Sequence, residues 1–325
     1  MKLSISLPTT IAYDPDVYSS FPDITKINDD YLVVYREGNS HHPDKSKLIF
    51  LKSKDLITWA REEFATASLE SDGFVFNCPK FSTIGKTTYL SCDTKTSTKE
   101  KDSIWNIFYW TTFDGNNWAS QKDFKINGMV PDKIISFKNK LLMGYHFIEK
   151  DDDNSQLVQM MGISHDRKNW RDKITIAVDN AHSFCEGSIV CIEDKKLFCY
   201  LRDNKSALLR SYICSSLDGY NWSKPQSLQF MGHRIVAAVK KKEPYSGLVV
   251  GTFRNTLNKS ISIFLHNLVK DKIQIETIDM ESNNSLWDFG YTGWIENNDG
   301  SLLVVYYIKR HKSNPEICLT KVTLL

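Results

Sequence analysis

The stretch "SSLDGYNW", residues 215–222, contains one of four similar motifs in the chain. Each motif has a serine or threonine, an aspartate two residues later and a tryptophan four residues after the aspartate. The other copies are "SKDLITW" at 53–59, "TFDGNNW" at 112–118 and "SHDRKNW" at 164–170. Because the first residues stand at 53, 112, 164 and 216, successive copies are 59, 52 and 52 residues apart. A nearly constant spacing of this size is typical of repeat architectures such as β-propellers.

A second repeat has a similar spacing. Two short runs of alternating apolar residues, joined by a polar turn, occur six times, and each pair predicts a β-hairpin. The hairpins begin near residues 21, 78, 131, 185, 233 and 291. The four motifs follow the first four hairpins, at the point where a third strand would turn into a fourth. Six units of four antiparallel strands predict an all-β, six-bladed β-propeller.

The two ends of the chain are expected to close the ring. The segment "EICLTKVTLL", residues 316–325, is suited to the third strand of the last blade, and "KLSISL", residues 2–7, to its outer strand. No segment of 12 or more residues has a helical pattern of apolar residues. We therefore expect residues 1–325 to form a single domain.

Composition narrows the classes of function. A net charge of +2 gives no reason to expect binding to nucleic acid, and no apolar run is long enough to predict a membrane span. The eight histidines and seven cysteines show no metal-ligand spacing, so neither a metal nor another cofactor is expected. The cysteines are expected to be reduced thiols. The start, "MKLSISLPTTIAYDPD", lacks the features of a signal peptide, which favours a cytoplasmic location; a periplasmic or secreted chain that had lost its leader would look the same.

The repeated motif is interpreted as scaffold. Its aspartate can accept hydrogen bonds from turn amides and from the serine or threonine hydroxyl, and a following glycine permits a positive φ. Two of the four copies lack that glycine. The tryptophan is expected to fill the space between adjacent sheets. One active site would not need four copies, so the unrepeated residues near the axis are the candidates for function.

The innermost strands of a propeller converge on its axis, so residues at equivalent ends of the hairpins can meet there. The hairpins open with Asp23, Lys80, Asp132, Lys133, Glu186, His233, Arg234 and Tyr291. The second strands end with Arg36, Asp93, His146, Arg202, Arg254 and Tyr307. The three arginines Arg36, Arg202 and Arg254 occupy the same offset in three different units, which is unusual for solvated surface charges.

Four Asp boxes on a sixfold hairpin repeat resemble the sialidase (neuraminidase) superfamily, whose BNR repeats have this form, along essentially the whole chain. The resemblance implies that Tyr291, in "GYTGWIENNDG", is a nucleophile and that Glu186, in "CEGSIV", activates it. It also implies that Arg202, in "CYLRDN", and Arg254, in "VGTFRN", bind a substrate carboxylate. A neutral tyrosine avoids the repulsion that a carboxylate nucleophile would meet at an acidic sugar.

The sequence departs from the sialidase pattern in two places. Ser20, in "SFPDI", stands where sialidases have an Arg-Ile-Pro arginine, and "YYIK" replaces the run that ends in its glutamate partner. Arg36 is the candidate for the third arginine. The acid is expected in "REGNSHHPDKSK", where Asp44 is the first candidate, with His41 or His42 as alternatives. Asp23 is a competing acid.

These residues predict a retaining exo-glycosidase that hydrolyses a terminal acidic 2-keto-3-deoxy sugar, such as sialic acid, Kdo or a related nonulosonate. The expected catalytic residues are Tyr291, Glu186 and Asp44. The expected substrate-binding residues are Arg36, Arg202, Arg254, Asp23, Arg234, His41 and Lys80. Two alternatives stay open: a non-catalytic carbohydrate-binding propeller, and a lyase that acts on uronic acids with a tyrosine or a histidine, His146 or His233, as its base. In each case the expected partner is an acidic glycan.

Overall fold

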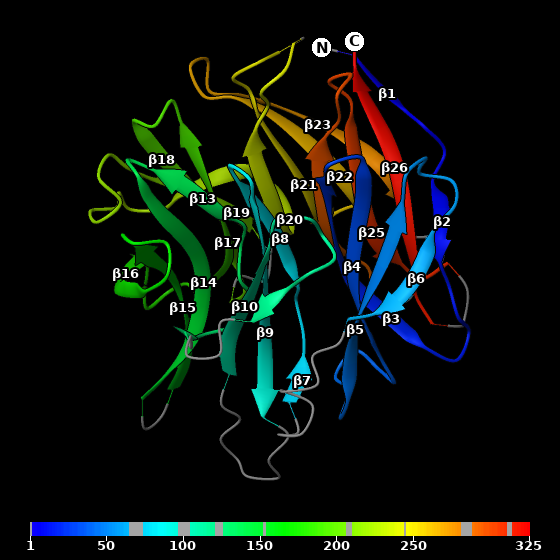
Figure 1. The fold of residues 1–325 in the computed structure, drawn as a ribbon. Helices are drawn as coiled ribbons and strands as arrows, with labels where there is room; N and C mark the ends of the chain where they lie inside the picture. The colour runs from blue at the N-terminus through cyan, green and yellow to red at the C-terminus, as the bar shows by residue number, and fades with distance from the viewer. Residues whose placement is uncertain are drawn as a thin grey trace.

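The computed structural model describes residues 2–64, 74–96, 105–120, 126–151, 154–205, 210–243, 245–280, 288–310 and 314–325. All regular structure within these ranges is β, as Figure 1 shows, which confirms the predicted class. The strands follow one another in chain order around the molecule, and the blue N-terminal strands lie beside the red C-terminal ones (Figure 1). The described strands form five hydrogen-bonded sheets.

Three of the sheets come from the first half of the chain. The first has the order β3-β4-β5-β6, with bounds Tyr18–Ile27, Asp30–Gly38, Ser46–Ser53 and Ala60–Glu63. The second contains β7 (Phe74–Phe76), β8 (Lys80–Ile84), β9 (Thr87–Thr96), β10 (Trp105–Thr112), β11 (Ala119–Ser120) and β12 (Ile126–Asn127). The third has the order β13-β14-β15-β16, with bounds Ile134–Phe137, Lys140–Asp151, Asn154–Ser164 and Trp170–Ala177.

The fourth sheet has seven strands in chain order. They are β17 (Phe184–Ile192), β18 (Lys196–Asp203), β19 (Arg210–Ser216), β20 (Gln226–Val239), β21 (Val249–Asn255), β22 (Ser260–Asn267) and β23 (Lys272–Met280). The long strand β20 pairs with β19 near Ser227 and with β21 from Gly232 onward. Two of the expected units are thus joined through one strand, so the division into six separate four-stranded blades stays a prediction.

The fifth sheet joins the two ends of the chain. It has the order β1-β26-β25-β24, with bounds Leu3–Ile5, Glu316–Leu324, Leu302–Ile308 and Gly290–Glu296, and β2 (Thr9–Ala12) also pairs with β26. Strand β1 runs antiparallel to β26, with Leu3 opposite Leu324. The expected pairing of the N-terminal strand with the last blade is therefore confirmed.

The strands that open the hairpins form the inner wall of the fold. These six strands touch in a closed cycle: β3 with β8, β8 with β13, β13 with β17, β17 with β20, β20 with β24, and β24 with β3. At the last junction, a Cβ on Gly293 would lie 2.0 Å from Asp23 Oδ1, so only glycine permits this approach. Apolar side chains fill the space between neighbouring sheets: Trp118, from the second sheet, lies 5.6 Å from the Phe50 ring of the first. Burial between sheets is the main stabilising contribution.

The four motif turns (53–59, 112–118, 164–170 and 216–222) connect the third strand of a unit to the fourth, as predicted. In the last turn the Ser216 hydroxyl donates to Asp218 Oδ1 at 3.0 Å, and the same oxygen accepts from the Tyr220 and Asn221 amides at 2.7 and 2.8 Å. Leu56 and Arg167 replace the glycine in two copies and still adopt φ of 64° and 62°. The hydrogen bonds of the turn therefore hold the left-handed conformation without glycine.

These turns lie at the opposite end of the strands from the candidate catalytic residues. A Cβ on Gly219 would lie 3.5 Å from Leu197, at the start of β18, whereas Arg202 lies near the end of that strand. A Cβ on Gly115 would lie 3.2 Å from Ile27, the last residue of β3, whereas Phe21 lies near its start. This placement fits the interpretation of the motif as scaffold.

Side chains at the inner strands link neighbouring strands at four of the six junctions described above. A carboxylate or hydroxyl on one strand accepts a hydrogen bond from a backbone amide of its neighbour. The pairs are Asp23 with Phe81 (2.7 Å), Ser82 with Ile134 (2.7 Å), Asp132 with Ile189 (2.8 Å) and Ser188 with Ala237 (3.0 Å). The acceptors are all buried, so these hydrogen bonds stabilise the ring.

We expect Ser82→Ala to lower the free energy of unfolding by about 1–3 kcal/mol, because the buried Ile134 amide then loses its acceptor. Urea denaturation would measure the change. Ser227→Ala, at an exposed position of β20, is the control and is expected to change stability by less than about 0.5 kcal/mol. Equal effects of the two substitutions would contradict the role of Ser82.

Candidate active site

The candidate site begins with irregular backbone at the start of the inner strands. Phe21, Glu186, Arg234 and Tyr291 have φ of 56°, 50°, 48° and 43°, each at a shift in register with the next strand. This left-handed conformation costs a residue other than glycine about 1–3 kcal/mol. Such strain is found at functional sites, and here it recurs at one position of four strands. The side chains of these four residues meet.

Tyr291 and Glu186 form the centre of the site. The Tyr291 hydroxyl donates a hydrogen bond to Glu186 Oε1, which also lies 2.8 Å from Arg202 Nη1. Burial alone would raise the pKa of Glu186, but Arg202 and Arg234 outweigh burial and hold that pKa below its usual range. Burial and the Glu186 charge raise the pKa of Tyr291 well above its usual range. The pair is therefore a neutral phenol that donates to an ionised carboxylate.

Two guanidinium groups flank the Tyr291 ring. The Arg254 guanidinium carbon lies 5.6 Å from the ring centroid and that of Arg234 lies 5.9 Å from it. Arg254 Nη2 donates to His233 Nδ1 at 2.8 Å, and Arg234 Nη2 donates to the Pro131 carbonyl at 2.8 Å. Arg234 is completely buried, whereas Arg254 keeps 6% of its surface exposed. Together with Arg202 they make the surroundings of Tyr291 strongly positive.

Arg36 lies outside this trio. Its Nε donates to Ser20 Oγ at 3.1 Å, so the guanidinium reaches the serine that replaces the sialidase arginine. Its other nitrogens donate to Asn77 Oδ1 at 3.1 Å and to the carbonyls of Ser40 and His41 at 3.3 and 3.0 Å. The sequence placed Arg36 in the substrate clamp; in the structure its described hydrogen bonds go to β3, to Asn77 and to the loop after β4, and its contact with a substrate stays a prediction. Arg234 instead is the third arginine beside Tyr291.

Asp23 and Lys80 lie beneath the site in the inner wall. The Asp23 carboxylate is buried and holds the Phe81 amide, with Lys133 Nζ at 3.7 Å. Lys80 Nζ donates to the Thr292 carbonyl at 2.9 Å, and burial lowers the pKa of Lys80 to about 8. Contacts of this kind fit a structural role for both residues better than the substrate-binding role expected from the sequence.

The loop after β4 brings His41, and not Asp44, into the described contacts of the site. Asp44 is exposed. The His41 ring lies 5.6 Å from the Phe21 ring, whose other neighbour is Tyr291 at 4.7 Å. His41 Nδ1 lies 2.8 Å from the Tyr18 hydroxyl and 3.4 Å from Asp288 Oδ1. Tyr18 also donates to Asp288 Oδ1.

Tyr18 and Asp288 were missed by the sequence reasoning. Each stands three residues before a residue with positive φ: Tyr18, at the start of β3, before Phe21, and Asp288, just before β24, before Tyr291. Strands β3 and β24 touch in the ring. The left-handed backbone that defines this shared offset is not visible in the sequence, so no sequence signal singled out the two residues.

The two histidines considered for a lyase lie close to the pair. His146 Nδ1 accepts from the Glu186 amide at 3.3 Å, and burial lowers the pKa of His146 to about 4. Burial, Arg202 and Arg254 lower the pKa of His233 to about 2. Both imidazoles are neutral at pH 7 and buried, so their contacts support the neighbouring groups.

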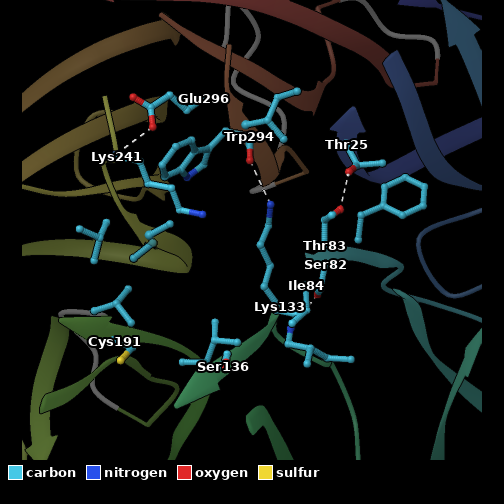
Figure 2. A pocket seen from close by; sticks show the side chains of 18 of the residues that line it. Thr25, Ser82, Thr83, Ile84, Lys133, Ser136, Cys191, Lys241, Trp294 and Glu296 are labelled. Atoms are coloured by element: carbon cyan, nitrogen blue, oxygen red, sulfur yellow. Dashed lines mark hydrogen bonds between the residues drawn. The ribbon is translucent and has the colours of Figure 1, made fainter. Parts of the chain in front are cut away.

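The other end of the inner strands opens into a cavity of about 650 Å³. Residues from all six inner strands line it (Figure 2), including Thr25, Ser82, Lys133, Ser136, Cys191 and Trp294. Figure 2 shows Lys133 reaching the Trp294 carbonyl, a hydrogen bond of 3.0 Å. The Glu296 carboxylate accepts hydrogen bonds from Lys240 Nζ and from the Lys241 and Lys242 amides. This end lacks a tyrosine–carboxylate pair among its lining residues, so the catalytic candidates are at the opposite end.

Within the described ranges, no group of three or more His, Cys, Asp or Glu side chains is arranged to hold a metal ion. No helix that could cross a membrane occurs among the described residues. All seven cysteines are free thiols, and six of them are buried.

Known structures resemble this chain over nearly its full length. A protein of unknown function from Dyadobacter fermentans matches with a TM-score of 0.84 and 16% identity over 99% of both chains. Trypanosoma rangeli sialidase matches with a TM-score of 0.69 and 13% identity over 94% of this chain. The chain has a sialidase-like propeller fold. It spans about half of that sialidase, of which 54% is covered.

The same fold is shared by a glycosidase with a different substrate. Penicillium chrysogenum α-L-arabinanase, solved with arabinobiose, matches with a TM-score of 0.71 and 14% identity over 97% of this chain and 98% of its own. No family model matches the chain, and no curated protein sequence matches it. At these identities the likeness shows the fold alone, so the activity must be argued from the site.

Proposed function

We propose that the protein is a retaining exo-glycosidase that removes a terminal acidic 2-keto-3-deoxy sugar, with Tyr291 as nucleophile and Glu186 as its base. The observation that carries the proposal is the hydrogen bond from the Tyr291 hydroxyl to the ionised Glu186, with the guanidinium carbons of Arg234 and Arg254 at 5.9 and 5.6 Å from the centroid of the tyrosine ring. Glu186 is in place to take the phenolic proton as the tyrosine oxygen attacks the anomeric carbon.

The charges around the pair favour an acidic substrate. The anomeric carbon of a 2-keto-3-deoxy sugar bears a carboxylate, which repels an anionic nucleophile and is attracted by arginine. Arg202 and Arg254 keep part of their surface exposed and can donate to that carboxylate. Arg234 is completely buried, so it contributes its charge without touching the sugar. This positive setting favours sialic acid, Kdo or a related nonulosonate over a neutral sugar.

A substrate screen tests the proposal. The purified protein would be incubated with 4-nitrophenyl or methylumbelliferyl glycosides of sialic acid, Kdo, arabinose and uronic acids. We expect release from at least one acidic keto-sugar and none from arabinose, with the first product retaining the anomeric configuration in proton NMR. Release from arabinose alone, or an inverted product, would overturn it.

A non-catalytic sugar-binding propeller is the second candidate. The internal contacts of Arg36 favour it, because they leave the clamp one accessible arginine short of the three expected from the sialidase resemblance. Binding of an acidic glycan in calorimetry with no turnover would support this candidate. A product absorbing near 230 nm, from a new carbon–carbon double bond, would indicate the lyase instead.

A further inference from the structure

We propose that His41 is the general acid and base of this reaction and that Asp288 is its positioning residue. The inference rests on the function proposed above. It identifies the residue that donates a proton to the leaving group. From the sequence, Asp44 is the first candidate for this role.

The contacts of His41 determine which of its ring nitrogens can exchange a proton with the substrate. The Tyr18 hydroxyl donates its one proton to Asp288 Oδ1, so its 2.8 Å contact with His41 Nδ1 requires a proton on that nitrogen. Asp288 Oδ1, 3.4 Å from the same nitrogen, favours the same tautomer. The other nitrogen, Nε2, is left to gain and lose a proton. A carboxylate that orients a histidine through Nδ1–H is the arrangement of many acid–base histidines.

The position of His41 agrees with this role. The rings of His41 and Tyr291 both lie against Phe21, at 5.6 and 4.7 Å. Arg36 holds the backbone of the loop by donating to the His41 carbonyl at 3.0 Å. The His41 side chain keeps 40% of its surface exposed, so a leaving group can reach it, whereas Asp288 keeps 21%.

Charge also favours the pair. Burial would raise the pKa of Asp288, but hydrogen bonds from His41 and Tyr18 hold it below its usual range. Asp288 is therefore ionised at neutral pH, so His41 Nδ1 faces a negatively charged oxygen. The titratable and charged groups that face His41 are Tyr18 on β3, Arg36 on β4, His42 in the same loop and Asp288 before β24.

The proton and electron movements balance over two steps. In the first, the Tyr291 oxygen bonds to the anomeric carbon while its proton passes to Glu186. The bond from that carbon to the leaving oxygen breaks, its electron pair stays on the oxygen, and His41 Nε2–H supplies the proton. In the second, neutral His41 takes a proton from water as the water oxygen bonds to the anomeric carbon. The bond to Tyr291 breaks, and the tyrosine oxygen regains its proton from Glu186.

Leaving-group dependence tests the acid. We would compare kcat/KM of wild type, His41→Gln and Asp44→Asn on a 4-nitrophenyl glycoside and on a sugar-linked disaccharide of the same acidic sugar. Because 4-nitrophenolate leaves without a proton, His41→Gln is expected to lose about 10²–10⁴-fold on the disaccharide and less than about tenfold on the nitrophenyl substrate. Equal losses on both substrates would indicate a structural role for His41 and overturn the inference.

The pH profile tests Asp288. A reaction that needs a protonated acid should slow as pH rises, and this alkaline limb should disappear in His41→Gln. Asp288→Asn removes the negative charge beside His41 Nδ1, so the position of its alkaline limb should differ from that of wild type. The exposed pair of His165, on a motif turn, and Asp172, on β16, 2.9 Å apart, supplies the controls His165→Gln and Asp172→Asn, which should leave the profile unchanged.

The possible results distinguish a failure of the role of His41 from a failure of the proposed glycosidase activity. Turnover by wild type with an unchanged profile in His41→Gln would overturn the role of His41 alone. A loss confined to Asp44→Asn, and larger on the disaccharide, would assign the acid to Asp44. No turnover by wild type on any acidic glycoside would overturn the proposed function together with the inference.

Discussion

Tyr291→Phe is expected to lower kcat by at least about 10³-fold while ligand affinity stays within about threefold. The substitution removes only the oxygen that would bond to the sugar. Phenylalanine keeps the ring against Phe21, 4.7 Å away, and beside the guanidinium groups of Arg234 and Arg254. The arginines that attract the carboxylate therefore stay in place, and binding should survive the loss of chemistry.

Steady-state kinetics and calorimetry would measure the two quantities on the same substrate. A substrate analogue with fluorine beside the anomeric carbon should also add one sugar mass to wild type and none to Tyr291→Phe, with the adduct mapped to Tyr291 by peptide mass spectrometry. Tyr220→Phe, on an exposed motif turn, is the matched control and should behave as wild type. Full turnover by Tyr291→Phe would remove the proposed nucleophile.

The repeat and the residues that it singled out were accessible from the sequence because they depend on local patterns. Asp218 holds its turn through atoms within three residues of itself, so its motif can be recognised without knowing the fold. Glu186 and Tyr291 open equivalent hairpins, and strands that touch around a ring bring such positions together whatever lies between them. The family resemblance implied that Glu186 activates Tyr291, and the two side chains are in contact.

The assignments that depend on where a long side chain points could not be predicted from local sequence patterns. Arg36 ends a second strand like Arg202, but a long flexible side chain can turn toward several partners, and Ser20 and Asn77 determine its direction. Asp23 was named for its charge, and the sequence did not indicate that its Oδ2 accepts from the Phe81 amide of the next strand. The contact between His41 and Asp288 joins residues nearly 250 positions apart, which no spacing rule predicts.

Glu186→Gln is expected to impair both activity and stability. The amide keeps the size of the side chain and can still accept from Tyr291, but it is too weak a base for the phenolic proton, so kcat should fall about 10²–10⁴-fold. Arg202, 2.8 Å away, and the buried Arg234 also lose their counter-charge. Leaving a buried charge without its partner lowers the free energy of unfolding, here by about 3 kcal/mol.

The stability loss should depend on pH in a defined direction. The pKa of Glu186 is lower in the folded protein than the ordinary value of 4.5. Its charge therefore contributes stability that is fully present above about pH 4.5 and is lost as pH falls toward the folded pKa. The difference in unfolding free energy between wild type and Glu186→Gln should thus be largest near neutral pH and shrink as the solution becomes more acidic.

Urea denaturation between about pH 3.5 and 7 would measure that difference, with the two-state character of both unfolding transitions checked by two probes. Glu63→Gln is the control, since the exposed ion pair of Glu63 with Lys47, 2.8 Å apart, contributes less than about 1 kcal/mol. A Glu186→Gln protein as stable as wild type at pH 7 would mean that Arg202 and Arg234 do not depend on this carboxylate. The anionic partner on which the activation of Tyr291 rests would then have to be another group.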